Sequence, residues 1–143
     1  GITEDGRASA VTTGGNPDCQ LILRGGASGS NYAAEDVAVA EEALNVAEVP
    51  ASIMIDCSHA NSGKDPQRQP VVMEEVLSQV SNGSGFIHSV MIESHLNAGG
   101  QPFPRPLEDL EYGVSITDGC IDWSSTEALL RRTAEVIDKA RFS

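Results

Sequence analysis

This sequence of 143 residues has few basic side chains and few cysteines, and each shortage excludes a class of protein. Nine basic residues against twenty-one acidic ones leave a net charge of −12, so there is no basic stripe for nucleic acid or for an anionic membrane surface. The same acidity is compatible with a phosphorylated small molecule, which needs only a few local cations. The three cysteines form no Cys-x-x-Cys motif, which favours a reduced, cytoplasmic setting over a disulfide framework.

Long apolar runs are absent too, which excludes a transmembrane helix. Aromatic residues are 4% of the chain while hydrophobic residues are 40%, so the core must be built mainly from aliphatic side chains. The length suits one domain with a sizeable core. Gly1 and Ile2 resemble the middle of a strand, which predicts that the chain is a piece of a longer protein.

Apolar runs and amphipathic stretches alternate along the chain. Short apolar runs predict strands, and apolar positions recurring every three or four residues predict helices. The expected strands cover residues 19–23, 51–56, 86–92 and 114–117, and the expected helices cover residues 33–47, 65–81 and 124 to near the C-terminus. Ser124 and Glu127 match a capping box for the last helix.

This alternation indicates an α/β fold with a parallel sheet and right-handed crossovers. A polar residue follows each expected strand: Arg24, His59, Glu93 and Asp118. Their separations of 35, 34 and 25 residues bracket the length of about 31 residues for one strand–helix unit of a (β/α)₈ TIM barrel. Four such units make half a barrel, and such barrels hold their chemistry at the carboxyl ends of the strands.

The first residues are expected to stand apart from this half-barrel. Residues 1–13 predict a β-hairpin, and the Gly-Gly-Asn-Pro-Asp run at residues 14–18 breaks the pattern. The expected division is therefore a hairpin and breaker at residues 1–18 and a half-barrel domain at residues 19–143.

His59, Glu93 and Asp118 would place one imidazole and two carboxylates at one edge of the sheet. Such a set suits a borderline divalent cation, namely Mn²⁺, Fe²⁺, Co²⁺ or Zn²⁺. Histidine and acidic residues at strand ends also occur as hydrogen-bonded structural residues, and both interpretations are open at this point. Arg24, which precedes two glycines, would bind a phosphate or carboxylate, or form a surface ion pair.

Cys57 lies two residues before His59 and would share its face in a regular strand. Its thiol could be a fourth ligand, although packing as a small buried hydrophobic group is the favoured interpretation. Cys19 and Cys120 are interpreted as packing residues as well.

A series of short motifs resembles one enzyme family. The motifs are Gly-Gly-Asn-Pro-Asp-Cys at residues 14–19, Ile-Leu-Arg-Gly-Gly at 22–26, Asn-Tyr at 31–32, Met-Ile-Asp-Cys-Ser-His-Ala-Asn-Ser at 54–62, Met-Ile-Glu-Ser-His-Leu at 91–96 and Tyr-Gly-Val-Ser-Ile-Thr-Asp-Gly-Cys at 112–120. In this order they resemble the C-terminal part of type I 3-deoxy-D-arabino-heptulosonate 7-phosphate (DAHP) synthase, and the resemblance covers nearly all of the chain.

The resemblance implies a metal-dependent transferase at the entrance to the shikimate pathway of aromatic amino-acid biosynthesis. This enzyme condenses phosphoenolpyruvate with erythrose 4-phosphate and releases phosphate, while the metal polarises the aldehyde. By motif, His59, Glu93 and Asp118 are metal ligands, and His59 is also catalytic. Arg24, His59 and Asp118 would contact substrate. The opening hairpin resembles the family's regulatory insertion, and Val11 matches a position in this allosteric pocket for aromatic amino acids.

Several parts of the family pattern are missing from the sequence. A cysteine ligand on the first barrel strand is absent, as are the Lys-Pro-Arg-Thr motif, the lysine of the fourth strand and the arginines of the second and third. Where the family has an aromatic residue, this chain has Cys57. The chain is therefore expected to be strands five to eight of the barrel and inactive alone. Its expected partner, in a homo-oligomer, is the N-terminal half of the barrel or a second copy.

Two alternative functions are weighed against this one. The first is the sister enzyme that makes 3-deoxy-D-manno-octulosonate 8-phosphate, against which the motifs at residues 22–26 and 93–96 argue. The second is a non-catalytic half-barrel that serves only as a partner for another chain, which the absence of the first four units favours for the isolated polypeptide.

Overall fold

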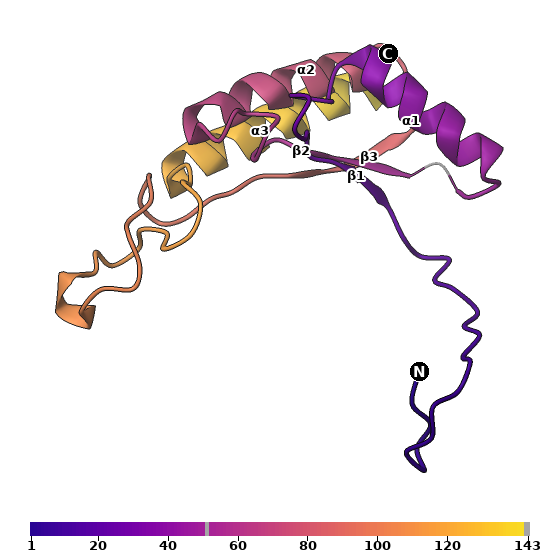
Figure 1. Cartoon of the computed structure of the whole chain (residues 1–143). Helices are drawn as coiled ribbons and strands as arrows, with labels where there is room; N and C mark the ends of the chain where they lie inside the picture. The colour runs from indigo at the N-terminus through magenta and orange to yellow at the C-terminus, as the bar shows by residue number, and fades with distance from the viewer. Residues whose placement is uncertain (51, 142–143) are drawn as a thin grey trace.

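The computed structural model describes residues 1–50 and 52–141 as a sheet covered by helices (Figure 1). The elements are β1 (Leu21–Leu23), α1 (Ala34–Val46), β2 (Ile53–Asp56), the 3₁₀ helix η1 (Pro66–Arg68), α2 (Gln69–Ser81), β3 (Ile87–Met91), the 3₁₀ helix η2 (Leu107–Asp109) and α3 (Trp123–Arg141). The three strands are parallel, in the order β1-β2-β3. In the described part of the chain, no helix combines the length and the apolar character needed to cross a membrane.

The strands form where apolar residues can face the helices. Ile53 and Ile55 of the central strand β2 have no exposed surface, and Leu23 of β1 is buried beside them. The strands expected at residues 19–23 and 86–92 are confirmed, although the first begins two residues later and the second is one residue shorter at each end. The strand expected at residues 51–56 is confirmed from Ile53 onward, and residue 51 lies outside the described residues.

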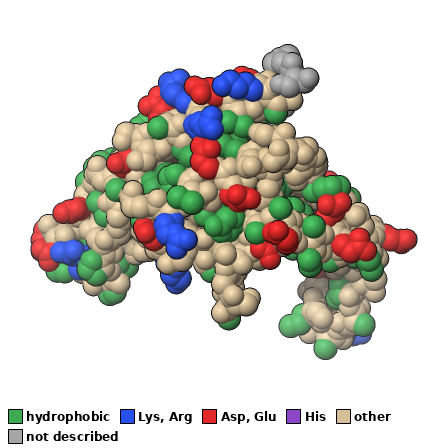
Figure 2. Space-filling view, turned by 90° about the horizontal axis from the view of Figure 1, so that it is seen from above, with side chains coloured by type: hydrophobic (Ala, Val, Ile, Leu, Met, Phe, Trp, Pro, Cys, Tyr) green, Lys and Arg blue, Asp and Glu red, His purple; other side chains and the backbone are tan. Residues whose placement is uncertain are grey.

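The helices expected at residues 33–47 and 65–81 are confirmed as α1 and as η1 followed by α2. Asp65 begins η1 by accepting a hydrogen bond from the Gln67 N–H at 3.0 Å, and Pro70 occupies the first turn of α2, where its missing N–H costs little. The apolar residues on the buried face of α2, which contacts β3 and α3, are Val72, Met73, Val76 and Leu77. The face of the molecule on the side of the helices carries more acidic than basic side chains (Figure 2).

The fourth strand expected at residues 114–117 does not form, which corrects the sequence prediction. This segment makes only an isolated bridge at Ser115. The chain that continues β3 pairs instead with Ile121, whose N–H donates to the Glu93 carbonyl at 3.1 Å. Ile121 therefore occupies the position beside Ser94, and residues 114–117 cannot pair with the extension of β3. Asp118 therefore lies in a loop rather than at the end of a strand.

The start of α3 also differs from the prediction. The helix begins at Trp123, and Asp122 rather than Ser124 caps it by accepting a hydrogen bond from the Ser125 N–H at 2.7 Å. Glu127 does not complete a capping box, because its carboxylate pairs with Arg131 one turn later at 2.7 Å. The predicted helix is real, but its first residue precedes the predicted start.

Residues 1–18 run away from the sheet and its helices (Figure 1). An antiparallel bridge joins Ile2 to Ala8, and the terminal amine donates to the Ser9 carbonyl at 2.9 Å. All of these residues are exposed, and so is Cys19, whose interpretation as a packing residue is wrong. Cys19 is exposed because it precedes Leu21, the first residue of β1 that pairs with β2, and so lies outside the sheet.

Candidate metal and substrate site

The loop after β2 carries most of the candidate site, and side chains within the loop fix its path. The buried Asn61 donates from Nδ2 to the carbonyl oxygens of Leu23, at 3.0 Å, and of Asp56, at 2.8 Å. Its Oδ1 accepts a hydrogen bond from the Asn31 N–H at 2.9 Å. The two bonds that Asn61 donates tie the loop to the last residue of β1 and to the last residue of β2.

His59 adopts a left-handed backbone conformation in this loop, with φ of 45°. Side chains other than glycine rarely take this conformation, and they keep it where the surroundings compensate for the strain. The compensation here includes a hydrogen bond from the Lys64 N–H to the His59 carbonyl at 2.7 Å. The turn directs the imidazole away from the buried core and over the end of the sheet.

The inner nitrogen of His59 is bound by its own neighbours. Nδ1 lies 2.7 Å from Oδ2 of Asp56 and 2.8 Å from the Ser58 hydroxyl. Oδ1 of Asp56 accepts from both the Ser58 N–H and the Ser58 hydroxyl, at 2.8 and 2.6 Å. Asp56 is 1% exposed, so this network is shielded from water and holds the ring in one orientation.

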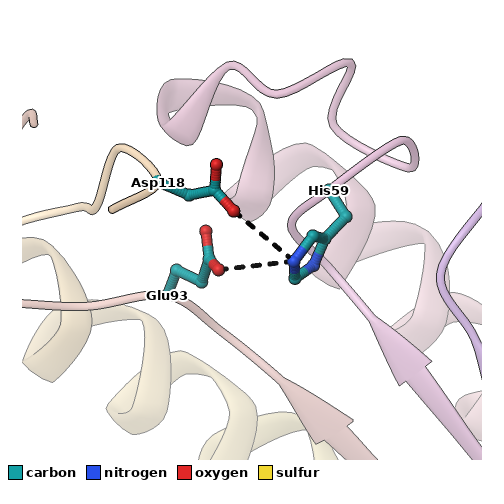
Figure 3. Close-up of side chains that lie close together, drawn as sticks. All are labelled: His59, Glu93 and Asp118. Atoms are coloured by element: carbon teal, nitrogen blue, oxygen red, sulfur yellow. Dashed lines mark ion pairs between the residues drawn. The ribbon is translucent and has the colours of Figure 1, made fainter. Parts of the chain in front are cut away.

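Nε2 of His59 faces two carboxylates that come from other segments (Figure 3). It lies 3.6 Å from Oε1 of Glu93 and 3.6 Å from Oδ2 of Asp118. One donor atom from each of the three residues lies within 4.8 Å of the others. Among residues 1–50 and 52–141, this is the one group of three or more His, Cys, Asp or Glu donors that is this close.

Glu93 is positioned by α2 through the buried side chain of Gln69. The Gln69 amide donates to the Glu93 carbonyl at 3.0 Å, and its oxygen accepts from the Glu93 N–H at 2.7 Å. Gln69 has no exposed surface and stands at the first position of α2. The helix therefore fixes the backbone of Glu93 just beyond the end of β3.

The electrostatics of the cluster favour a cation. Burial raises the pKa of the Glu93 carboxyl, and the negative charges of Asp118 and Asp56 add to the rise, while His59 and Arg24 oppose it. A divalent ion between Glu93 and Asp118 would reverse this effect by favouring both ionised carboxylates. One imidazole and two carboxylates fit Mn²⁺, Fe²⁺, Co²⁺ or Zn²⁺, so the residues present suit the metal that the sequence predicts.

Arg24 lies beside this cluster, in an open hollow of about 380 Å³. Lys64, His59 and Asp118 also line the hollow. Gly25 forms part of its wall with φ of 72°, and a Cβ there would lie 2.7 Å from the Cβ of Ala60. Only glycine fits this position, and two cationic side chains beside it suit a phosphate-bearing ligand.

The structure brings the predicted residues Arg24, His59, Glu93 and Asp118 to one place, while Val11 lies elsewhere. Val11 belongs to the exposed segment at residues 1–18. Cys57 is fully buried in the core, and burial raises the pKa of its thiol to about 12. The condition for Cys57 to share a face with His59, a regular strand through both residues, is not met, because β2 ends at Asp56.

Sequence reasoning misses the supporting residues Asp56, Asn61 and Gln69. Asp56 and His59 are three positions apart, which is a short enough separation to suggest a side-chain contact, and this signal is available in the sequence. The partners of Gln69 and Asn61 are distant in sequence, so only the folded chain identifies them.

Comparison with known proteins identifies the family of the chain. Residues 2–131 match the family described as the DAHP synthetase I family. The chain belongs to this family. It is 46% identical over 131 residues to the Tyr-sensitive phospho-2-dehydro-3-deoxyheptonate aldolase of Escherichia coli K12, covering 92% of this chain and 36% of that protein. It is 48% identical over 140 residues to the Phe-sensitive aldolase of the same organism, covering 98% and 39%.

A solved structure resembles the fold as well. The phospho-2-dehydro-3-deoxyheptonate aldolase from Francisella tularensis SCHU S4 superposes with a TM-score of 0.84 at 39% identity, covering 96% of this chain and 39% of that one. The three strands and three helices therefore match part of the TIM barrel of a DAHP synthase. The chain spans less than two fifths of the length of that aldolase and of both Escherichia coli relatives.

Proposed function

We propose that this chain is the C-terminal half of the catalytic barrel of a DAHP synthase, with β1 to β3 as consecutive barrel strands. The activity is the condensation of phosphoenolpyruvate with erythrose 4-phosphate, with release of phosphate. The observation that carries this proposal is the cluster of His59, Glu93 and Asp118, within 4.8 Å, in a chain of this family.

The residues of the chain have separate tasks in this reaction. A divalent cation held by His59, Glu93 and Asp118 would supply Lewis-acid chemistry to an aldehyde oxygen. Arg24 binds the phosphate or carboxylate of phosphoenolpyruvate, because a guanidinium offers paired donors to such groups. Gly25 lets the segment after Arg24 pack closely against Ala60 and the Gly29 carbonyl, which supports the wall of the hollow. Together these groups orient the substrates at the open edge of the sheet.

Calorimetric titration with Mn²⁺ tests the proposed metal site directly. We expect one ion per chain, bound weakly because the family's cysteine ligand is missing, with an affinity that falls as His59 is protonated. The variant His59→Ala should lose binding, whereas the matched change His88→Ala should retain it, because His88 lies at the other end of β3 and contacts Ser52. Equal binding by His59→Ala and the unaltered chain would refute the assignment.

The isolated chain should not catalyse the condensation. Several cations and one metal ligand of the family pattern are missing from its sequence, and positioning supplies much of the rate of such reactions. Phosphate release is expected only when the N-terminal remainder of a relative is added, and only with erythrose 4-phosphate. Activity of the pure chain would refute this, and a preference for arabinose 5-phosphate would favour the sister octulosonate synthase. A mixture that assembles without activity would favour a non-catalytic partner.

Residues 1–18 are proposed to belong to a regulatory element, with Val11 in an aromatic amino-acid pocket. The support is the resemblance of this hairpin to the family's regulatory insertion, together with the names of relatives that are Tyr-sensitive or Phe-sensitive. Weaker inhibition of the complemented enzyme by tyrosine or phenylalanine in a Val11→Asp variant is the expected result.

A further inference from the structure

The hydrogen atoms around His59 can be assigned from the donors and acceptors that surround it. The Ser58 hydroxyl has a single proton, and it donates that proton to Oδ1 of Asp56 at 2.6 Å. At 2.8 Å from Nδ1 of His59, the same hydroxyl must therefore accept. Oδ2 of Asp56, at 2.7 Å from Nδ1, can only accept when the carboxyl is ionised. Both contacts require a hydrogen on Nδ1.

We infer that Asp56 is a positioning residue, which holds the proton of His59 on Nδ1 and thereby presents the lone pair of Nε2 to the site. This inference rests on the proposed function, because the lone pair is useful only to a metal or another electrophile between Glu93 and Asp118. Asp56 does not itself face Glu93 and Asp118, since its carboxylate contacts Nδ1, the ring nitrogen that points away from them.

The surroundings of Asp56 make this arrangement rigid. The residue is 1% exposed, and its Oδ1 is already engaged by the N–H and hydroxyl of Ser58. Asn61 holds the Asp56 carbonyl from the other side at 2.8 Å. A buried carboxylate with these partners cannot turn away from the ring without leaving donors unpaired. A carboxylate that binds the second nitrogen of a ligating histidine fixes both its orientation and its tautomer.

The substitution Asp56→Asn tests the inference because it preserves shape and reverses one hydrogen bond. The amide oxygen can still accept from Ser58, which leaves the amide N–H₂ facing Nδ1. A donor at that position requires a lone pair on Nδ1, so the proton should move to Nε2. Long-range proton–nitrogen NMR correlations of the imidazole, recorded where the ring is neutral, distinguish the two tautomers without any metal or substrate.

The expected spectra show an Nδ1–H ring in the unaltered chain and mainly an Nε2–H ring in Asp56→Asn. Ser58→Ala should keep the Nδ1–H tautomer, since the carboxylate contact remains, and this variant serves if Asp56→Asn does not fold. Asp138→Asn, the same chemical change on the exposed surface of α3, should leave the ring unaltered. An Nε2–H ring in the unaltered chain, or an unchanged tautomer in folded Asp56→Asn, would overturn the inference.

Metal binding provides a second measurement. Calorimetry with Mn²⁺ should show an affinity about 10- to 100-fold lower for Asp56→Asn than for the unaltered chain, while Asp138→Asn binds normally. Equal affinities of Asp56→Asn and the unaltered chain would overturn the positioning role. If the unaltered chain binds no metal, the proposed function fails, and the NMR spectra still decide whether Asp56 sets the tautomer.

Discussion

Two cysteines near the ends of strands differ in their surroundings, and this difference sets their reactivity. Cys57 is fully buried, and burial followed by the charge of Asp56 raises the pKa of its thiol to about 12. Cys19 is exposed. Since the thiolate is the reactive form, a disulfide reagent at neutral pH should modify Cys19 in the folded chain and should modify Cys57 only after unfolding.

Peptide mapping after labelling, with and without urea, checks this prediction. Cys57→Ser is expected to leave Mn²⁺ affinity unchanged, because its thiol is in the core and outside the donor cluster. Burying a hydroxyl there should lower the free energy of unfolding by about 1–3 kcal/mol. A large loss of metal affinity in a folded Cys57→Ser chain would assign the thiol to the site after all.

At the scale of elements, the junction between α2 and β3 depends on Gln69. Its side chain makes two hydrogen bonds with the backbone of Glu93 and has no exposed surface. Gln69→Ala would leave the part-buried Glu93 N–H without this partner, which should lower the free energy of unfolding by about 1–2 kcal/mol. Metal affinity should fall as well, because the position of Glu93 is no longer fixed.

Urea unfolding and Mn²⁺ calorimetry measure these two effects. Gln67→Ala, two residues earlier and exposed, is the matched control. Gln69→Glu should give an intermediate result, since a carboxylate still accepts from the Glu93 N–H but cannot donate to its carbonyl. Wild-type affinity in Gln69→Ala would show that β3 alone positions Glu93.

The start of α3 predicts a dependence of stability on pH. Hydrogen bonds from the Ser125 N–H, from the Ser125 side chain and from the Ser124 hydroxyl lower the pKa of Asp122 below its ordinary value of 3.8. A lowered carboxyl pKa stabilises the folded chain above the unfolded value, and this contribution is lost as the pH falls through the folded value. Asp122→Ala should therefore be less stable than the unaltered chain at neutral pH.

Thermal unfolding at several pH values tests this expectation. The difference between the unaltered chain and Asp122→Ala should shrink below pH 3.8. The difference between Asp122→Asn and Asp122→Ala should change little over the same range, because neither variant has a carboxyl at this position. A constant difference down to the lowest pH would mean that the cap does not depend on the ionised carboxyl.

Local patterns in the sequence are sufficient to predict three parallel strands, the helices and the residues of the donor cluster. Apolar periodicity identifies α1, α2 and α3, because each helix buries one face on neighbouring residues. It fails at residues 114–117, where strand formation depends on which segment lies beside β3. It also fails for Gln69 and Asn61, whose partners are 24 and 38 residues away. Their roles depend on tertiary contacts, which periodicity does not encode.

At the scale of the whole molecule, the sheet is covered by helices on one side only (Figure 1). Ile22 of β1 is 44% exposed, and the outer edges of β1 and β3 have backbone groups available for pairing. The proposed half-barrel should therefore self-associate or bind the complementary half. Sedimentation velocity should show a mass that rises with concentration.

Ile22→Lys should reduce this association, because a charge on the uncovered strand opposes pairing. Val39→Lys, at an exposed position on α1, is the matched control and should associate as before. A compact monomer over a wide concentration range would contradict the prediction.

The three donors come from segments that are far apart in the chain: Glu93 is 34 positions after His59, and Asp118 is 25 positions after Glu93. An ion that joins them would act as a removable cross-link that closes two long loops. The site is assembled only when the chain folds, so the ion binds the folded form and shifts the folding equilibrium toward it. The melting temperature should therefore rise with the concentration of Mn²⁺ and return to its starting value when a chelator is added.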